Sequence, residues 1–274
     1  MFQVSDGRTA ASPATAPASR RVYQIAHSTH FTRSANSADR AGCDIKHKSV
    51  RCSTCSMQRV CMPSGLTPDE SARLDAIICS TRTVRRGESL YRCGDAFQSL
   101  YAVRSGCFKT VVLHREGQEQ LTGFYLAGDA LGLDGVSSDH HSCDAIALED
   151  SVVCIIPFDL LELLCREVKA IQHHVHRLMS SEIVRESSLM MLLGTMTAEQ
   201  RVAAFLLNIS TRMKARGYSP AQFVLRMTRE EIGSYLGLKL ETVSRMFSKL
   251  QKAGVVDARG KDVRILDQAE LESV

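Results

Sequence analysis

Three cysteines stand close together in the first quarter of the chain, where Cys52, Cys55 and Cys61 have the spacing C-x2-C-x5-C. Thiolates this close lose little loop entropy when they gather around one ion or cluster. A site of four thiolates needs one more ligand, and the remaining cysteines supply the candidates: Cys43, Cys79, Cys93, Cys107, Cys143, Cys154 and Cys165. The pattern predicts a metal centre whose fourth ligand comes from elsewhere in the chain.

The type of centre depends on the compartment and on the cysteine spacing. The first residues contain no apolar segment of the kind that a secretory signal carries, and no run of about 18 apolar residues occurs, so we expect a cytoplasmic protein without a membrane span. In that reducing compartment clustered cysteines bind metal or do redox chemistry more often than they form disulfides. Zinc usually takes two paired C-x2-C knuckles, and this chain has one, which favours an iron–sulfur cluster. Zinc, disulfides and redox-sensing thiols remain the alternatives.

A second pattern, over residues 227–256, has the features of two short helices joined by a tight turn. Thr228 and Glu231 form a capping box that opens a helix, and Gly237 closes it. A second helix follows at about residues 240–253. Its core-facing residues are Val243, Phe247 and Leu250. Its outward positions carry polar side chains: Glu241, Thr242, Ser244, Arg245 and Lys249.

These features predict a helix-turn-helix whose second helix presents its first side chains to base edges in the DNA major groove. An arginine there can bind guanine, and a glutamate can accept a hydrogen bond from cytosine. Residues 198–266 contain 13 Lys and Arg against 6 Asp and Glu, whereas the whole chain has a net charge of only +4. This local excess suits DNA phosphates, and it favours a DNA-binding helix over an ordinary solvated one.

Other elements must position these two groups of residues. Between residues 67 and 165, short apolar runs alternate with glycines, which predicts an antiparallel β-roll. Residues 166–195 form one long helix in our prediction, and residues 196–274 complete a winged helix-turn-helix domain. Ahead of the roll we expect a disordered tail at residues 1–45 and a cysteine-rich, cluster-binding segment at residues 46–66. The fold class is therefore α+β.

The long helix carries a seam of the kind that pairs two helices. Its positions step by four, three, four and three residues: Met179, Ile183, Glu186, Met190 and Leu193. In a parallel dimer the acidic member, Glu186, would face its own copy. Two such charges about 5 Å apart repel by roughly 3 kcal/mol at an effective dielectric near 20. We therefore expect a marginal homodimer, which a modest change in the sensor part forms or breaks.

With these residues in hand, the chain resembles the CRP/FNR superfamily of bacterial transcription regulators, and within it the oxygen-sensing FNR branch. The resemblance extends from about Cys52 to Leu266. The matching stretches are L-Y-A-V-R-S-G at 100–106, T-G-F at 122–124, L-A-G-D at 126–129, the pair His140 and His141, V-C-I-I-P-F at 153–158, L-M-S at 178–180 and E-T-V-S-R at 241–245.

The resemblance implies a sensor domain of the cupin-like, cyclic-nucleotide-binding type, a dimerisation helix and a winged helix-turn-helix. It implies a [4Fe-4S] cluster on Cys52, Cys55, Cys61 and Cys154, because the fourth cysteine of the family stands just before an I-P-F segment. It also implies that the loaded homodimer binds a TTGAT-type inverted repeat in double-stranded DNA when oxygen is absent. Oxygen would destroy the cluster and release the dimer.

The resemblance also assigns contacts with DNA and with RNA polymerase. Glu241, Ser244 and Arg245 fall on the base-reading positions of the family, with Thr242 beside them. Ser105 falls in a loop that touches RNA polymerase in the family. In a second such loop, residues 116–120, Gln118 stands where the FNR pattern has an acid, so one polymerase contact differs in this chain.

Three other functions fit the sequence less well. A cyclic phosphate needs an arginine clamp, but between Arg115 and Arg166 the chain has no Lys or Arg and has ten Asp and Glu. Haem could use histidines, but a His-rich helix is more often surface than ligand. An enzyme would need a catalytic motif, and the chain has no Gly-rich phosphate loop, no G-x-S-x-G and no H-E-x-x-H. We expect neither an enzyme nor a cyclic-nucleotide receptor.

Overall fold

The fold is taken from a computed structural model, in which all described residues belong to one compact unit. The described residues are 51–78, 80–113 and 119–274. The predicted tail at 1–45, the first part of the cysteine-rich segment, Cys43, Cys79 and the loop that holds Gln118 lie outside them.

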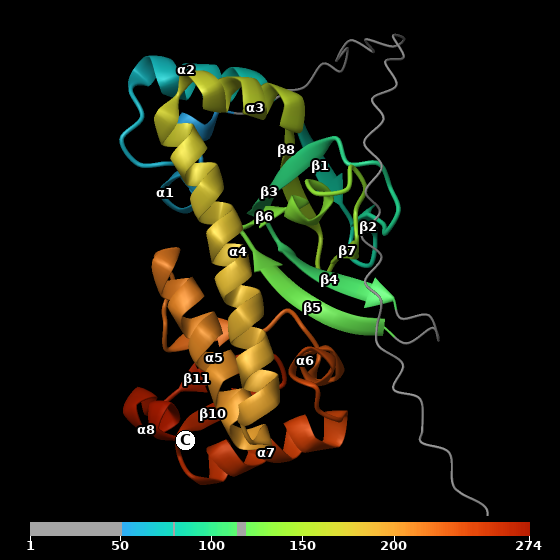
Figure 1. The fold of residues 1–274 in the computed structure, drawn as a ribbon. Coiled ribbons are helices and arrows are strands. Elements are labelled where there is room, and N and C mark those ends of the chain that lie inside the picture. The colour runs from blue at the N-terminus through green and yellow to red at the C-terminus, as the bar shows by residue number, and fades with distance from the viewer. Residues whose placement is uncertain (1–50, 79, 114–118) are drawn as a thin grey trace, which may run out of the picture. The chain divides into compact units, whose positions relative to one another are not determined.

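Eight strands form the sensor part, and they pair into two antiparallel sheets of four strands. The first sheet has the order β1-β8-β3-β6, with the bounds Ser80–Val84, Ser151–Pro157, Ser99–Ser105 and Ala130–Leu131. The second has the order β2-β7-β4-β5, with the bounds Ser89–Tyr91, Asp144–Ala147, Cys107–Leu113 and Glu119–Leu126. Strands of both sheets contribute to one apolar core that includes Val84, Val103, Phe108 and Val153. The predicted antiparallel roll is confirmed (Figure 1).

The strands that the sequence indicated are the apolar ones. Apolar runs mark β2, β3, β4, β5 and β8, whereas β1, β6 and β7 were not expected. β1 reads STRTV and β6 has only two residues, so neither gives a periodic apolar signal of its own. These strands form because adjacent strands of the sheet hydrogen-bond to them. For example, β1 pairs with β8, with Thr81 opposite Cys154.

Short helices surround one end of the roll. The cysteine segment forms a 3-10 turn, η1 (Cys52–Thr54), and a single helical turn, α1 (Gln58–Cys61). Helix α2 (Pro68–Ile77) opens with a capping box between Thr67 and Glu70, and it contacts α3 (Phe158–Glu167). A second 3-10 turn, η2 (Leu133–Gly135), follows β6.

The long helix, α4, spans Lys169–Thr195 and so begins three residues later than we expected. Arg166 and Glu167 end α3 instead, because Val168 between the two helices has an extended backbone with φ −118° and ψ 97°. The Val168 side chain is buried in the apolar core beneath α2 and α3. Burying this side chain takes Val168 out of the helical conformation, and α4 leaves in a new direction (Figure 1).

The C-terminal part is a helix-turn-helix with a three-stranded sheet. Its helices are α5 (Ala198–Ala215), α6 (Arg229–Leu236), α7 (Leu240–Lys252) and α8 (Gln268–Ser273), and its strands are β9 (Gln222–Val224), β10 (Val256–Arg259) and β11 (Asp262–Ile265). The capping box at Thr228 and Glu231 is confirmed, as is the end of α6 at Gly237, whose φ of +62° is one that glycine adopts without strain. The predicted core residues Val243, Phe247 and Leu250 are buried.

None of the described helices combines the length and the apolar character that crossing a lipid bilayer requires.

Candidate metal centre and nucleic-acid interface

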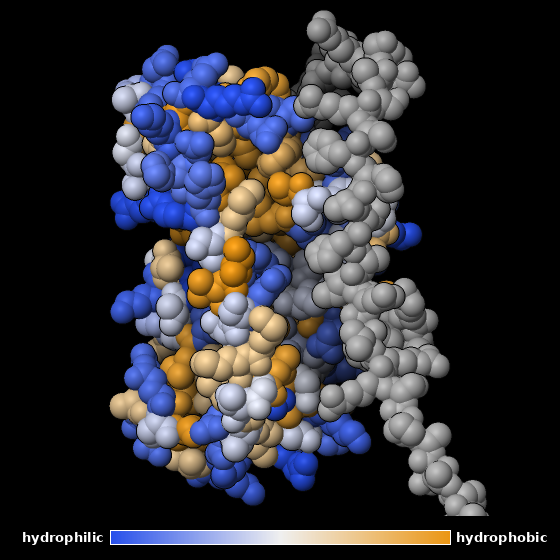
Figure 2. Space-filling model, viewed as in Figure 1, coloured by the Kyte–Doolittle hydropathy of each residue, from blue (hydrophilic) through white to orange (hydrophobic). Residues whose placement is uncertain are grey.

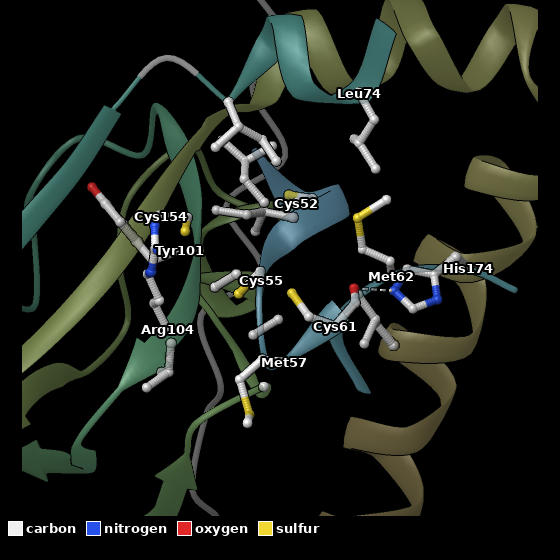
Figure 3. A pocket seen from close by; sticks show the side chains of 18 of the residues that line it. Cys52, Cys55, Met57, Cys61, Met62, Leu74, Tyr101, Arg104, Cys154 and His174 are labelled. Atoms are coloured by element: carbon white, nitrogen blue, oxygen red, sulfur yellow. Dashed lines mark hydrogen bonds between the residues drawn. The ribbon is translucent and has the colours of Figure 1, made fainter. Parts of the chain in front are cut away.

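The cysteine segment and the roll meet at one cavity of about 80 Å³. Cys52, Cys55 and Cys61 line it from η1 and α1, and Cys154 lines it from the middle of β8 (Figure 3). The four thiols that the resemblance singled out therefore lie around a common space. Four other cysteines of the described residues do not line it: Cys93, Cys107, Cys143 and Cys165.

The thiols of this cavity are largely shielded from water. Cys52 is 8% exposed and Cys154 is 7% exposed, while Cys55 and Cys61 are half-buried. Burial raises the pKa of the Cys61 thiol to about 12, and neighbouring thiols, Cys154 first among them, add to the effect. Burial is also the main cause that raises the pKa of Cys52 and of Cys154. Such thiols stay protonated at neutral pH unless a metal replaces the proton.

One ion and a cluster need different arrangements of their thiolates. Within residues 51–78, 80–113 and 119–274, no three His, Cys, Asp or Glu side chains converge on a point where a single ion could bind. A zinc ion holds its thiolates about 2.3 Å from one centre, and so needs such a convergence. A cluster of several iron ions accepts thiolates that stand further apart around a larger space. Four thiols that line one cavity are a donor set that an iron–sulfur cluster could use.

Three contacts hold the cysteine segment against the rest of the chain. Asp75 on α2 accepts a hydrogen bond from the backbone N–H of Cys52 at 2.8 Å. Val60 packs against Gly128, where any Cβ would lie 2.7 Å from a Val60 methyl carbon, so only glycine fits. His174 on α4 is the third contact, and its ring nitrogen Nε2 lies 3.0 Å from the carbonyl oxygen of Cys61.

The predicted seam lies on a helix with much apolar surface. Ile183 is 64% exposed and Met190 is 67% exposed, and Glu186 between them is exposed too. Met179 and Leu193 are half-buried. In Figure 2 apolar colour gathers along the path that α4 takes in Figure 1. Large apolar side chains left open to water on one helix are typical of an interface with another chain.

The candidate base-reading residues lie on the outer side of α7. Glu241, Ser244 and Arg245 are exposed, and Thr242 is half-buried. Arg245 contacts only the Thr242 hydroxyl in the described part of the chain, at 3.3 Å, so its guanidinium keeps donors free for another molecule. The N-terminal turn of α7 thus has the exposed polar groups that a recognition helix needs.

A second cavity, of about 330 Å³, lies between the roll and α4. Arg185 of α4 lines it, together with Tyr125 and Glu182. Arg185 binds both the Glu182 carboxylate and the Tyr125 hydroxyl, and its guanidinium carbon lies 4.3 Å from the centre of the Tyr125 ring. The sequence predicts no arginine clamp here because residues 116–165 contain no Lys or Arg, but α4 brings Arg185 to the cavity from outside that stretch. The positive charge of Arg185 is already paired with Glu182 and Tyr125.

Charged contacts link the sensor part to the helix-turn-helix part. Asp129 lines the cysteine cavity and accepts hydrogen bonds from Arg212 of α5 and from Arg216, which caps the C-terminal end of that helix. Lys109 on β4 donates to Glu231 on α6 at 2.9 Å. Sequence reasoning missed these pairs, the role of Arg185 and the His174 contact, because each joins residue types that are common on any surface.

The predicted polymerase contact, Ser105, ends β3 at the turn to β4 and is exposed. It lines a cleft of about 520 Å³, to which residues of α5 and β9 also contribute.

A β-roll joined by a long helix to a winged helix-turn-helix defines a class of proteins, the DNA-binding transcription regulators with a sensor domain. Comparisons with known families agree. Residues 200–274 match the Crp-like helix-turn-helix domain, and residues 81–168 match the cyclic nucleotide-binding domain.

Similar proteins narrow the class. The chain is 42% identical over 222 residues to the Fumarate and nitrate reduction regulatory protein of Vibrio cholerae, covering 81% of this chain and 89% of that protein. It is 44% identical over 225 residues to the Transcriptional activator protein Anr of Pseudomonas protegens, covering 82% and 92%. Among solved structures, FixK2 from Bradyrhizobium japonicum has a TM-score of 0.66 at 29% identity, covering 71% of this chain and 96% of that one. The chain belongs to the FNR branch of the CRP/FNR family, and it is a transcription regulator rather than an enzyme.

Proposed function

We propose that this regulator carries a [4Fe-4S] cluster on Cys52, Cys55, Cys61 and Cys154 and uses it to make DNA binding respond to oxygen. The observation that carries the proposal is the common cavity: three thiols of one short segment and one thiol of a distant strand line the same space. The names of its relatives are in keeping with it, since four of them are called Fumarate and nitrate reduction regulatory protein. A bound cluster would supply reactivity toward oxygen.

The residues of the chain suggest how the signal reaches DNA. When the four thiolates are tied together, the segment from Cys52 to Cys61 is fixed against β8. When the thiols are free, the contacts to Asp75, Gly128 and His174 hold it together with apolar packing of the segment. The first three turns of α4 form part of the same cavity wall, so the position of the segment affects the helix that carries the seam.

The dimer, the DNA contacts and the compartment complete the proposal. Two copies pair through Met179, Ile183, Glu186, Met190 and Leu193. In the pair, Glu241, Thr242, Ser244 and Arg245 of each copy read one half of a TTGAT-type inverted repeat, and Ser105 touches RNA polymerase in the cytoplasm. Half-sites about one helical turn apart on the DNA would suit such a symmetric pair.

Cyclic nucleotides are not part of the proposed function. The cavity between the roll and α4 holds Asp134, Glu182 and Glu186 against the single cation Arg185, as far as the described residues line it. Since Arg185 is already paired with Glu182 and with Tyr125, a phosphate would have to displace its partners.

Iron and sulfide analysis of protein purified without oxygen tests the proposal. We expect wild type to contain both elements and to lose its absorbance near 400 nm in air. Cys154→Ala should lose the iron, whereas Cys143→Ala and Cys165→Ala, which remove cysteines outside the cavity, should keep it. A colourless protein that holds zinc and binds DNA equally well before and after aeration would support the zinc alternative and overturn the cluster.

A further inference from the structure

One polar contact joins the cysteine segment to the long helix. The His174 ring donates its Nε2 proton to the carbonyl oxygen of Cys61 at 3.0 Å, as the dashed line in Figure 3 shows. A carbonyl oxygen can only accept, so the proton must sit on Nε2. Among the described residues this is the only hydrogen bond between residues 51–66 and α4.

The other contacts of the segment lead to different elements. The N–H of Cys52 is held by Asp75 of α2, and Val60 rests on Gly128 after β5. Neither contact involves α4. The other side chains of α4 that line this cavity are apolar. Apolar contacts are non-directional, so they do not fix the orientation of the cysteine segment. The direction of the segment relative to α4 therefore depends on His174.

The same helix bears the seam. Ile171, His174, Val175 and Leu178 recur at helical spacing and line the cysteine cavity. The seam positions begin one residue later, at Met179, about a quarter of a turn round the helix. Because α4 is continuous from Lys169 to Thr195, a shift at His174 moves the seam as part of one body.

We propose that His174 is a positioning residue for Cys61, and that its hydrogen bond couples the placement of the cysteine segment to the placement of the dimer helix. The proposal rests on the proposed function for the identity of the group bound at the cysteines. The hydrogen bond between His174 and Cys61 does not depend on that group. Coupling of two binding equilibria is reciprocal. If a bound metal centre strengthens dimerisation by some factor, dimerisation strengthens binding of the centre by the same factor.

Amide hydrogen exchange of the iron-free protein tests the bond without any bound group. His174→Ala should speed exchange of the amides of residues 58–62 by about twofold to tenfold, the range for loss of one ordinary hydrogen bond. His174→Gln keeps an N–H donor and should restore the wild-type rate. His173→Ala, which removes the neighbouring exposed histidine, should leave it unchanged. Equal exchange in wild type and His174→Ala would overturn the proposal.

The coupling is tested on protein loaded with iron and sulfide in the absence of oxygen. In His174→Ala, the half-life of bound iron against a chelator should shorten and the dimer association constant from sedimentation should fall, each by a factor of about two to ten. His174→Gln and His173→Ala should match wild type in both. If iron retention changes while dimerisation does not, the coupling is wrong. If wild type takes up no iron, the proposed function fails, and the exchange rates still decide whether His174 holds Cys61.

Discussion

Arg185 and Arg245 both lie on helices and differ in what surrounds them. Arg185 is packed against Tyr125 and paired with Glu182, so its charge is used inside the chain. Arg245 lies open on α7 with only the Thr242 hydroxyl beside it among the described residues. A partner can recruit an open guanidinium at little cost, whereas a buried pair is costly to separate. This difference makes Arg245 the stronger candidate for reading a base.

Replacing Arg245 by alanine tests that role. We expect affinity for a duplex with the TTGAT-type inverted repeat to fall by about 1–3 kcal/mol for each subunit, the usual value of an arginine–guanine pair. Affinity for a random duplex should fall far less, since it depends on phosphates. Fluorescence anisotropy at one fixed salt concentration measures both. The control is Gln251→Ala, exposed at the far end of α7, which should keep the preference. An equal loss on both duplexes would show that Arg245 binds phosphate only.

Glu231 illustrates a residue whose surroundings shift its pKa. Burial raises this pKa, but hydrogen bonds from the Thr228 N–H and from Lys109 lower it more, so it lies below the ordinary value of 4.5. A carboxylate with a lowered pKa stabilises the fold above its unfolded pKa, and this contribution is lost as the pH falls through the folded pKa.

We therefore expect Glu231→Gln to lose about 1 kcal/mol of stability at pH 7, a value reduced because both partners are partly exposed. In a chain of this size that lowers the melting temperature by about 2–4 °C. Once the pH has fallen below the folded pKa of Glu231, the two proteins should melt together, because protonated Glu231 no longer carries the charge. Melting curves followed by circular dichroism at several pH values measure this. Glu230→Gln, an exposed neighbour, should change little at any pH, and a constant difference between wild type and Glu231→Gln across pH would contradict the account.

At the scale of elements, local signals predicted most of what forms. The capping box of Thr228 and Glu231 starts α6, and Gly237 ends it. Both signals depend on residues only a few positions apart, so they can be recognised in the sequence. The break between α3 and α4 at Val168 could not be predicted this way, because it follows from burial of one side chain against α2 and α3. The strand β1 was missed for the same kind of reason, since its place depends on β8.

Helix α4 exposes large apolar side chains of the kind that pack against another chain. Glu186 stands between the exposed Ile183 and Met190. If two copies pair there, the two carboxylates repel by about 1 kcal/mol in water and about 3 kcal/mol at an effective dielectric near 20. Apolar burial along the same helix opposes this repulsion. The balance makes the dimer sensitive to a small change at the sensor.

Glu186→Ala and Glu186→Gln should therefore dimerise in air, even without iron, with an association constant about 5 to 150 times that of wild type. Sedimentation equilibrium measures the constant. The matched control is Glu162→Ala, which removes an exposed acid from α3 and should leave the protein as wild type. Monomeric Glu186 variants in air would mean that repulsion at this position does not limit pairing.

At the scale of the whole molecule, the links between the sensor part and the helix-turn-helix part were beyond prediction from sequence. The cysteine spacing pointed to Cys52, Cys55 and Cys61, and the family resemblance pointed to Cys154. Nothing in the sequence marked Asp129 as the residue that faces both the cysteine cavity and α5. Residues far apart in sequence meet only through the packing of complete domains, and an aspartate with two arginines has no spacing that identifies it.

Asp129 pairs with two cations at the C-terminal end of α5, and its loss tests how strongly the two parts are joined. Arg216 is 4% exposed in its side chain and lies 2.6 Å from one Asp129 oxygen, and Arg212 binds the other. The backbone N–H of Leu126 also donates to Asp129, at 2.7 Å. Removing one partner from a buried ion pair leaves the other charge without compensation, which costs about 3–5 kcal/mol when burial is complete.

Because Asp129 and Arg212 are partly exposed, we expect Asp129→Asn to cost about 2–4 kcal/mol, and to lower the melting temperature by about 4–16 °C. The control is Asp257→Asn, which breaks a pair with the largely exposed Arg259 and should cost less than about 1 kcal/mol. Calorimetry adds a second readout. If Asp129 joins the sensor part to α5, the variant should unfold in two resolved steps where wild type unfolds in one. A single transition at the wild-type temperature would show that the other contacts, such as Lys109 with Glu231, hold the two parts together without Asp129.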